Sequence, residues 1–297
     1  MAYVTGSAAD MAAVKTALVN ACTANGWTEQ TDAGGKTMLS NSGCYVRVEA
    51  TSTALQLLGR TSLDSGDSPT VVQMKQVLST SIAFPVTYFA FVFATEVFFV
   101  INYSDMYQWI AFGQSQQPGL PGTGNWISAT CFNAANDDAN ISIREDGGGQ
   151  YYDNTVCPAL FWASTSKYGN PNCWIHNNFE TAYPWSIYQG GNKGNDSGVG
   201  IGSITEFIKA QPNQFNGEGI LLPIRAYKRR PESKLSQILE IENARHIRID
   251  NYTPEQVITL GSDEWMVFPW FRKNATERDA GQSIDHTGTF GWAIKKA

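Results

Sequence analysis

Charged residues are scarce in this chain of 297 residues, because Asp, Glu, Lys and Arg make up only 16% of it, well below the usual quarter. The net charge of −6 and the isoelectric point near 5.1 argue against binding to nucleic acid. Histidine occurs three times, at His176, His246 and His286, with none of the spacings HxH, HExxH or HxxxH that ligate metals. We expect each histidine to have a structural role.

Cysteine is also sparse, and no CxxC spacing of a zinc site is present. We expect reduced, buried thiols. A single disulfide remains an open alternative, and Cys157 with Cys173 is then the pair we expect. The five cysteines are Cys22, Cys44, Cys131, Cys157 and Cys173.

The motifs of common catalytic sites are missing. The sequence has no GxSxG turn for a nucleophilic serine and no Walker loop for phosphate. The glycines at residues 147–149 follow Asp146 and open no helix pattern, so we expect no phosphate cradle there. We predict no catalytic, cofactor-binding or metal-binding residues and no intrinsic catalytic activity.

Two Asn-Asp clusters, at residues 136–140 and 195–196, contain oxygen ligands of the kind that a hard cation prefers. Neither cluster has EF-hand spacing, and such sequences are common in turns, so we predict turns. A glycosidase would need two carboxylates at a separation that only the fold defines. Asp137 and Asp138 are the carboxylates to test for that activity.

No hydrophobic run is long enough to cross a membrane. Residues 86–101 form a run of 16 residues that contains Glu96, whereas a helical span needs about 20 apolar residues. The sequence MAYVTGSAAD lacks the basic and apolar regions of a signal peptide. We expect synthesis and folding in a cytoplasm and no membrane insertion.

Aromatic residues are abundant instead, and many of them gather in residues 86–113 together with Val and Ile. This composition is typical of β-strands. Apolar residues occupy both alternating positions, so we predict a β-meander that is covered on both faces. An open meander would promote aggregation, so the rest of the fold or a neighbouring subunit must cover it.

The residues around the meander predict a small α+β unit over residues 1–115. Apolar spacings of three and four predict a helix over residues 7–25, with Ser7 as N-cap and Asp10 in a capping box. A second helix is predicted over residues 69–78, with Ser68 as its cap. Short strands are predicted at residues 37–40, 43–50 and 55–60.

Residues 116–218 are rich in Gly, Asn, Ser, Gln and Pro but contain Trp, Tyr and Phe, which disordered segments rarely have. We predict a loop-rich insertion of long ordered loops that aromatic side chains anchor. A second interpretation makes some of these aromatics a platform for a sugar ring, and the composition favours the anchors. The residues in question are Trp174, Tyr183, Trp185 and Tyr188.

The strand pattern returns over residues 219–297 and predicts an antiparallel β unit, either a sandwich or barrel-like. The basic cluster Lys228-Arg229-Arg230 is interpreted as the solvated end of its first strand. The fold class of the whole chain is therefore predicted as α+β, mainly β. The C-terminal strands are predicted at residues 220–228, 236–242, 245–250, 256–260, 264–270 and 291–295.

Two segments resemble structural proteins of tailed bacteriophages and prophages: ATEVFFVINYSDMYQWIAFGQS in the meander and GSDEWMVFPWFRKNATERDAGQSIDHTGTFGWAIKK near residue 297. The N-terminal unit is similar in element order to tail-terminator and tail-completion domains. The resemblance covers mainly the two ends of the chain and carries over no functional residue. It implies a virion structural protein of the tail, neck or baseplate, arranged in copies around the tail axis.

Two functions therefore follow as expectations. The first is a virion structural component, located in the virion, whose partners are copies of itself and other virion proteins. The second is a carbohydrate- or receptor-binding β protein, including the case of a glycosidase. The first accounts for the low charge and the aromatic strands, and the second accounts for the Trp and Asn residues of the middle segment.

Overall fold

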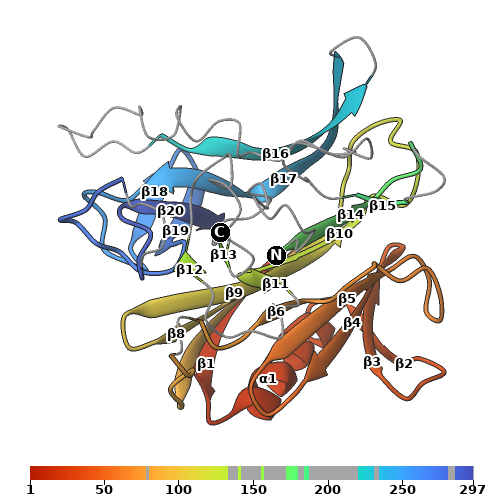
Figure 1. Cartoon of the computed structure of the whole chain (residues 1–297), viewed down its shortest axis with the longest axis horizontal. Helices are drawn as coiled ribbons and strands as arrows, with labels where there is room; N and C mark the ends of the chain where they lie inside the picture. Colours follow the sequence, from red (N-terminus) through yellow and green to blue (C-terminus); the bar gives the residue numbers. More distant parts are fainter. Residues whose placement is uncertain are drawn as a thin grey trace.

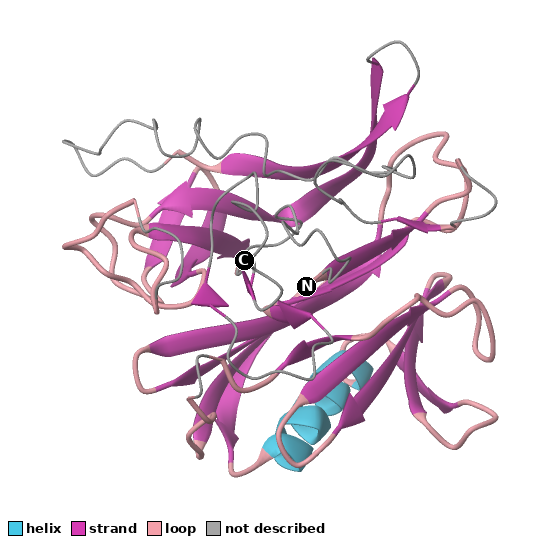
Figure 2. Ribbon diagram, in the orientation of Figure 1, coloured by secondary structure: helices cyan, strands magenta, loops and turns pink. Residues whose placement is uncertain are grey.

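The computed structural model describes residues 1–77, 80–132, 140–141, 155–156, 172–179, 184–186, 220–230, 234–279 and 285–296. Three antiparallel sheets form successive layers in this part of the chain, and one helix packs against the first layer (Figures 1 and 2). The predicted α+β, mainly β class is confirmed. The helix among these residues is 13 residues long, too short and too polar to cross a membrane.

The chain begins with a strand, β1 (Ala2–Ala8), where the sequence predicted a helix start. The helix α1 spans Met11–Thr23, and the carboxylate of Asp10 caps its first turn by accepting a backbone hydrogen bond of 2.7 Å. The assignment of Ser7 as N-cap was wrong. Residues 2–8 pair along the outer strand of the meander, and this long-range pairing outweighs the local capping pattern.

The aromatic segment forms the predicted meander at the centre of the molecule. Its three strands pair antiparallel in chain order, and strands from both sides in sequence extend the same sheet to seven strands. The order across the sheet is β1-β7-β8-β9-β10-β14-β15. The meander strands are β7 (Val86–Val92), β8 (Glu96–Tyr103) and β9 (Met106–Gln114). The strands that extend the sheet are β1, β10 (Asn125–Ala129), β14 (Cys173–His176) and β15 (Trp185–Ser186).

The first layer is a six-stranded sheet that lies below the meander in Figure 1, with α1 beside it. The three strands predicted between residues 37 and 60 are confirmed. The order across this sheet is β11-β6-β5-β4-β3-β2. Its strands are β2 (Thr28–Thr31), β3 (Thr37–Asn41), β4 (Cys44–Ala50), β5 (Leu55–Arg60), β6 (Val72–Met74) and β11 (Cys131–Phe132).

The helix predicted over residues 69–78 was wrong, because this segment contains β6, which pairs with β5 and β11. Ser68 closes the preceding turn and caps no helix. Its hydroxyl accepts a hydrogen bond of 3.1 Å from Gly59 N, and its own N–H donates to Gly59 O at 2.8 Å. A Ser-Pro pair is compatible with either a helix start or a turn. Here the pairing of β6 with its neighbouring strands favours the turn.

The C-terminal residues form one five-stranded antiparallel sheet, which covers the other face of the meander (Figure 1). The antiparallel pairing was predicted, but the described strands form a single layer against the meander and not a sandwich or barrel of their own. The strands expected at residues 236–242 and 245–250 are one long strand with a bulge. The order across the sheet is β16-β17-β20-β19-β18. These strands are β16 (Leu222–Arg230), β17 (Lys234–Arg248), β18 (Val257–Leu260), β19 (Asp263–Pro269) and β20 (Phe290–Lys295).

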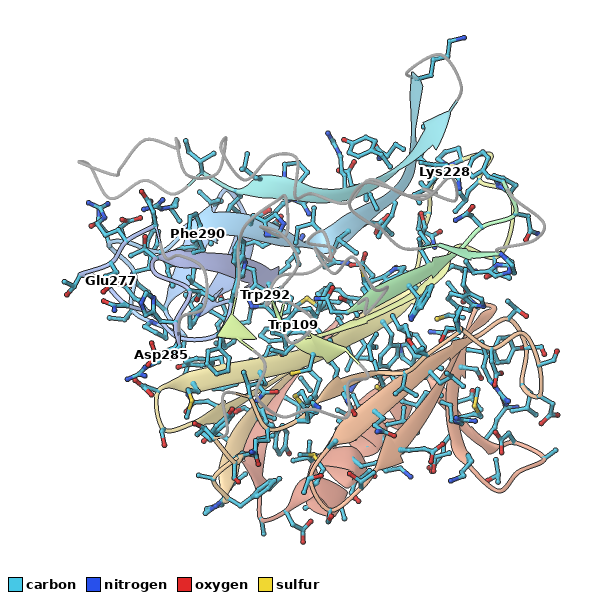
Figure 3. The ribbon with its side chains drawn as sticks, viewed as in Figure 1. Trp109, Lys228, Glu277, Asp285, Phe290 and Trp292 are labelled. Atoms are coloured by element: carbon cyan, nitrogen blue, oxygen red, sulfur yellow. The ribbon has the colours of Figure 1, made fainter. Side chains whose placement is uncertain are left out.

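The meander is buried on both faces. This confirms the prediction that we made from the apolar residues at both alternating positions of its strands. Phe99 and Phe112 belong to the core shared with α1 and the first layer, and Phe98 belongs to the core shared with the C-terminal sheet. Trp109 and Trp292 meet between the last two layers with ring centroids 5.2 Å apart (Figure 3). The central sheet therefore provides one wall of each core.

Most of the predicted loop-rich insertion, residues 116–218, lies outside the described residues. Within its described parts, β10, β14 and β15 extend the central sheet and β11 joins the first layer. A short parallel pair joins β12 (Asn140–Ile141) and β13 (Thr155–Val156). The division of the chain at residues 115 and 218 stays a prediction.

Candidate functional site

The three histidines lie apart in the fold, and two of them accept hydrogen bonds from the backbone. Nδ1 of His176 accepts a bond of 3.0 Å and Nδ1 of His286 one of 3.1 Å. His246 is buried in β17, with its ring 5.4 Å from that of Trp270, and burial lowers its pKa to about 3. No three His, Cys, Asp or Glu residues of the described chain gather to hold a metal ion.

Trp174 and Trp185 anchor loops and present no open sugar platform. Both are buried in the core between the central sheet and the first layer. Their indole N–H groups donate to the loop between β5 and β6, at 3.1 Å for Trp174 and 3.0 Å for Trp185. The other two aromatics of that interpretation, Tyr183 and Tyr188, lie outside the described residues.

The acidic clusters of the sequence also fall largely outside the described residues, including Asp137, Asp138 and residues 195–196. Residues 147–149 and Cys157 lie there too, so the pairing of Cys157 with Cys173 stays untested. Cys22 and Cys44 are buried thiols, and burial raises the pKa of both. Neither thiol is therefore a ready nucleophile at neutral pH.

The basic cluster at residues 228–230 does form the end of a strand, β16, as the sequence indicates. Lys228 itself is buried rather than solvated. The long apolar part of a lysine side chain can be buried while its ammonium group contacts polar groups. This part of the sequence interpretation was wrong.

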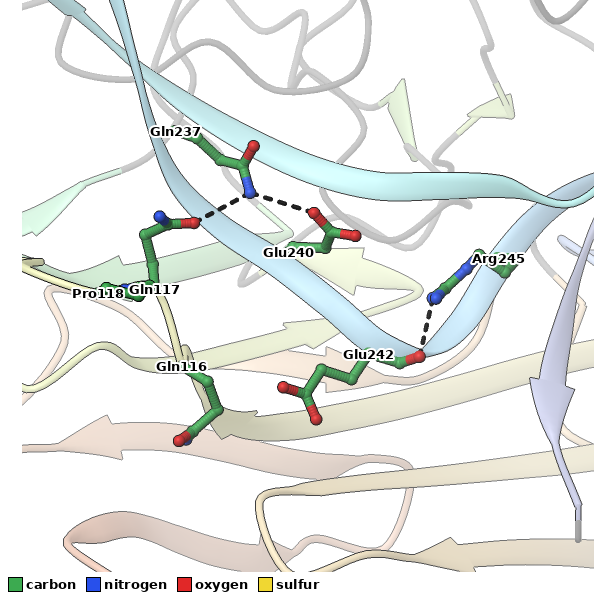
Figure 4. Close-up of a pocket in the computed structure, with 7 residues that line it drawn as sticks. All are labelled: Gln116, Gln117, Pro118, Gln237, Glu240, Glu242 and Arg245. Carbon is green, nitrogen blue, oxygen red and sulfur yellow. Dashed lines mark hydrogen bonds between the residues drawn. The ribbon is translucent and has the colours of Figure 1, made fainter.

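A polar pocket of about 290 Å³ opens at the bulge of β17 (Figure 4). Ile224 of β16 pairs with Ile241, but the neighbouring Pro223 pairs with Arg245, so residues 242–244 have no pairing partner in β16. Ala244 still pairs with β20 on the other side. Bulges of this kind turn side chains away from the sheet and locally end pairing. The pocket is lined by Gln116, Gln117 and Pro118 after β9 and by Gln237, Glu240, Glu242 and Arg245 of β17.

Two charged side chains bind the backbone of the bulge. The carboxylate of Glu96, in β8, accepts hydrogen bonds from Glu242 N at 2.9 Å and from Asn243 N at 3.0 Å. The Asn243 side-chain amide adds a third bond of 2.9 Å. Arg245 Nη1 donates to the carbonyls of residues 241, 242 and 244, each at 2.8 Å. These bonds satisfy backbone groups that would otherwise lose their ladder partners.

Glu96 is the most unusual acid of the described chain, because its side chain lies between two layers and is 1% exposed. Burial raises its pKa to about 7, although the hydrogen bonds from residues 242 and 243 act in the opposite direction. Removal from water therefore costs the carboxylate more than its three donors return. Glu96 is a positioning residue beneath the pocket, and it does not line it.

Amides and carboxylates dominate the chemistry of the pocket. Gln237 Nε2 donates to Gln117 Oε1 at 3.0 Å and to Glu240 Oε2 at 3.2 Å. Arg225 also binds Glu240, and its hydrogen bond lowers the pKa of that carboxyl. The Glu242 side chain extends toward the loop of Gln116 (Figure 4). Such a lining can hydrogen-bond hydroxyl or amine groups, but it offers no Ser, Cys or His nucleophile.

Sequence reasoning missed Glu96 and Arg245 as a pair that shapes a site. A signal was present for Glu96, because its neighbouring residues in the strands are apolar on both faces. A lone carboxylate in such a strand must be buried and hydrogen-bonded. Its partners lie about 146 residues away in sequence, and no local pattern indicates them. Arg245 had no such signal, because its contacts depend on the bulge.

The border of the C-terminal sheet is the second notable surface. Four large hydrophobic side chains are exposed within the described residues, and three belong to this unit: Ile220 at 42%, Val257 at 36% and Leu260 at 44%. Val257 and Leu260 are the first and last residues of β18, an outer strand of the sheet. This strand contains no charged residue, no proline and no glycine.

Comparison with known proteins found no matching family model and no matching curated protein. The proposals below therefore rest on the sequence and on the geometry of the described residues.

Proposed function

We propose that the protein is a structural component of a tailed-bacteriophage virion, in the tail, neck or baseplate, that assembles as repeated copies around the tail axis. Its partners are copies of itself and other virion structural proteins, and it acts without catalytic activity of its own. The resemblance of the meander and the C-terminal segment to phage structural proteins supports the class. The layered arrangement of sheets supports a static scaffold.

The observation that carries the proposal is the exposed apolar edge at β18. An uncharged outer strand is a template for pairing with another chain, and free proteins normally protect such edges with Lys, Pro or a covering loop. Val257 and Leu260 remain exposed at this edge in the described structure. In an assembly subunit such an edge can form a contact between subunits, because a neighbouring copy covers it.

The direct test is the protein content of purified particles. We expect peptides of this chain in density-purified virions of the phage or induced prophage that encodes it, at a constant ratio of several copies per particle. A major tail protein is the positive control, and a phage enzyme that stays in the lysate is the negative control. Recovery of the chain only in the soluble lysate would overturn the proposal.

The second candidate is a carbohydrate- or receptor-binding protein, and the pocket beside Glu242 favours it. Amide and carboxylate groups are suitable partners for sugar hydroxyls. On this alternative, a glycan array would give binding that Glu242→Gln and Gln237→Ala both weaken, while Lys36→Gln on the first layer leaves it unchanged. Equal array signals for all four proteins would exclude the pocket as a receptor site.

A further inference from the structure

The bulge of β17 is a short segment between two paired anchors. Residues 242 and 243 pair with neither neighbouring strand of the described sheet. Ile241 on one side is paired with β16, and Ala244 on the other side is paired with β20. A segment without ladder bonds opens at a lower free-energy cost than the paired strands beside it. The bulge is therefore the part of β17 that can move while the strand stays in the sheet.

Glu96 ties this segment to the central sheet. Its carboxylate accepts hydrogen bonds from the backbone N–H groups of Glu242 and Asn243 and from the side-chain amide of Asn243. The bonds of Arg245 are of a different kind, because they run to carbonyls of β17 itself. They maintain the shape of the bulge at every pH and do not reach β8. Within the described chain, the hydrogen bonds that hold the segment against β8 therefore all end on Glu96.

We propose that residues 242 and 243 form a flap, which is closed over Glu96 while its carboxyl group is neutral and opens when the group ionises. A neutral carboxyl group still accepts hydrogen bonds, so it can hold the closed flap. An ionised group gains far more from hydration, and it reaches water only if the flap moves out, because Glu96 is 1% exposed in the closed form. Glu242 lines the pocket, so the opening changes one wall of it. The flap adds a pH response to the proposed static role and does not depend on that role.

Burial and the neighbouring groups decide which form Glu96 takes in the closed state. β7, β8 and β9 contain no other charged residue, and the nearby thiol of Cys44 in the first layer is neutral, because burial raises its pKa. On β17, Glu242 raises the pKa of Glu96, whereas Arg245 attracts the carboxylate. Glu240 is ion-paired with a cation of β16. Burial outweighs both Arg245 and the three hydrogen bonds, and it raises the pKa of Glu96 to about 7.

Hydrogen exchange of the backbone amides of Glu242 and Asn243 tests the flap, measured by NMR and corrected for the intrinsic dependence of exchange on pH. A pKa of about 7 in the closed form and the ordinary value of 4.5 in the open form make the opening equilibrium rise about tenfold between pH 6 and pH 8. We expect the protection of both amides to fall by this factor in the wild type. Glu96→Gln should abolish the dependence. Glu29→Gln, at an exposed carboxylate of β2, is the control and should leave it unchanged.

The backbone amide of Phe99 is the internal reference, because β8 is paired on both sides there and the amide exchanges only when the central sheet opens. Protection of the two bulge amides equal to that of Phe99 would mean that they exchange only by global unfolding, which overturns the flap. Protection that stays constant or rises between pH 6 and pH 8 would overturn it as well. The NMR signal of the Glu96 carboxyl carbon gives the midpoint of ionisation in the wild type, so the test holds even if Glu96→Gln does not fold. A midpoint near the ordinary 4.5 would contradict the mechanism.

Discussion

At the residue scale, Glu96 makes the stability of the protein depend on pH. Its pKa is about 7 in the folded protein, against an ordinary value of 4.5. Between these pH values the folded protein binds more protons than the unfolded chain, so the free energy of unfolding falls as the pH rises. The stabilising contribution is complete below pH 4.5 and is lost as the pH rises through 7. It amounts to about 3 kcal/mol at most.

Glu96→Gln should remove this dependence. Denaturant unfolding at pH 5, 6.5 and 8 measures it for the variant and the wild type. The wild type should lose stability relative to the variant across this range. Glu29→Gln is the control, because Glu29 is an exposed carboxylate of β2 in the first layer. Parallel pH profiles for wild type and Glu96→Gln would show that Glu96 is not the titrating group.

Single residues were the least predictable level from sequence. The buried position of Trp174 and Trp185 agrees with their interpretation as loop anchors, because tryptophans amid glycine-rich loops have few other ways to be buried. Lys228 was expected in solvent and is buried. The reason is general: the environment of a side chain depends on strands brought together by the fold, and neighbouring residues in sequence carry little of that information.

At the element scale, the meander strands should contribute strongly to stability. Phe91 and Phe99 are fully buried on opposite faces of the central sheet, in different cores. Phe91→Ala and Phe99→Ala should each lower the free energy of unfolding by ~3–5 kcal/mol. Thr87→Ala, at an exposed position of β7, should change it by less than about 0.5 kcal/mol. Urea unfolding monitored by tryptophan fluorescence gives all three values.

β20 should be required for folding, because it lies between β17 and β19 and pairs with both. Deletion of residues 289–297 opens two strand edges and removes Trp292 from the core. We expect insoluble protein. A shorter deletion, residues 296–297, leaves the strand intact and should stay soluble. A soluble and cooperatively folded longer deletion would mean that β17 and β19 can close the sheet by themselves.

Strands with long aromatic or β-branched runs were predicted well, because their pattern reflects a two-sided burial that few other elements have. Residues 69–78 were predicted incorrectly, because β6 is only three residues long and too short to give a strand pattern. Its pairing with β5 forms a strand where the local sequence indicated a helix. The start of the chain failed for the same reason, since β1 depends on pairing with β7. The bulge in β17 had no sequence signal, and it divided one strand into two apparent ones.

At the scale of the whole molecule, the central sheet couples the two cores. It supplies Phe99 and Phe112 to one core and Phe98 and Trp109 to the other. The C-terminal sheet therefore buries its apolar inner face against residues from a different part of the sequence. A domain in the usual sense has its own core, and the residues that close the C-terminal core come from the meander.

This dependence predicts that residues 219–297 do not fold when expressed alone. Phe268 would lose its contact with Phe89, at a ring separation of 5.3 Å, and Trp292 would lose Trp109. The exposed inner face should make the fragment insoluble or dye-binding, whereas co-expression with residues 1–218 should restore a soluble complex. Calorimetry of the full chain should show a single transition, which Phe91→Ala and Phe99→Ala both shift to lower temperature. A fragment that melts sharply by itself, or two transitions that respond to one variant each, would establish the C-terminal sheet as an independent domain and refute the coupling.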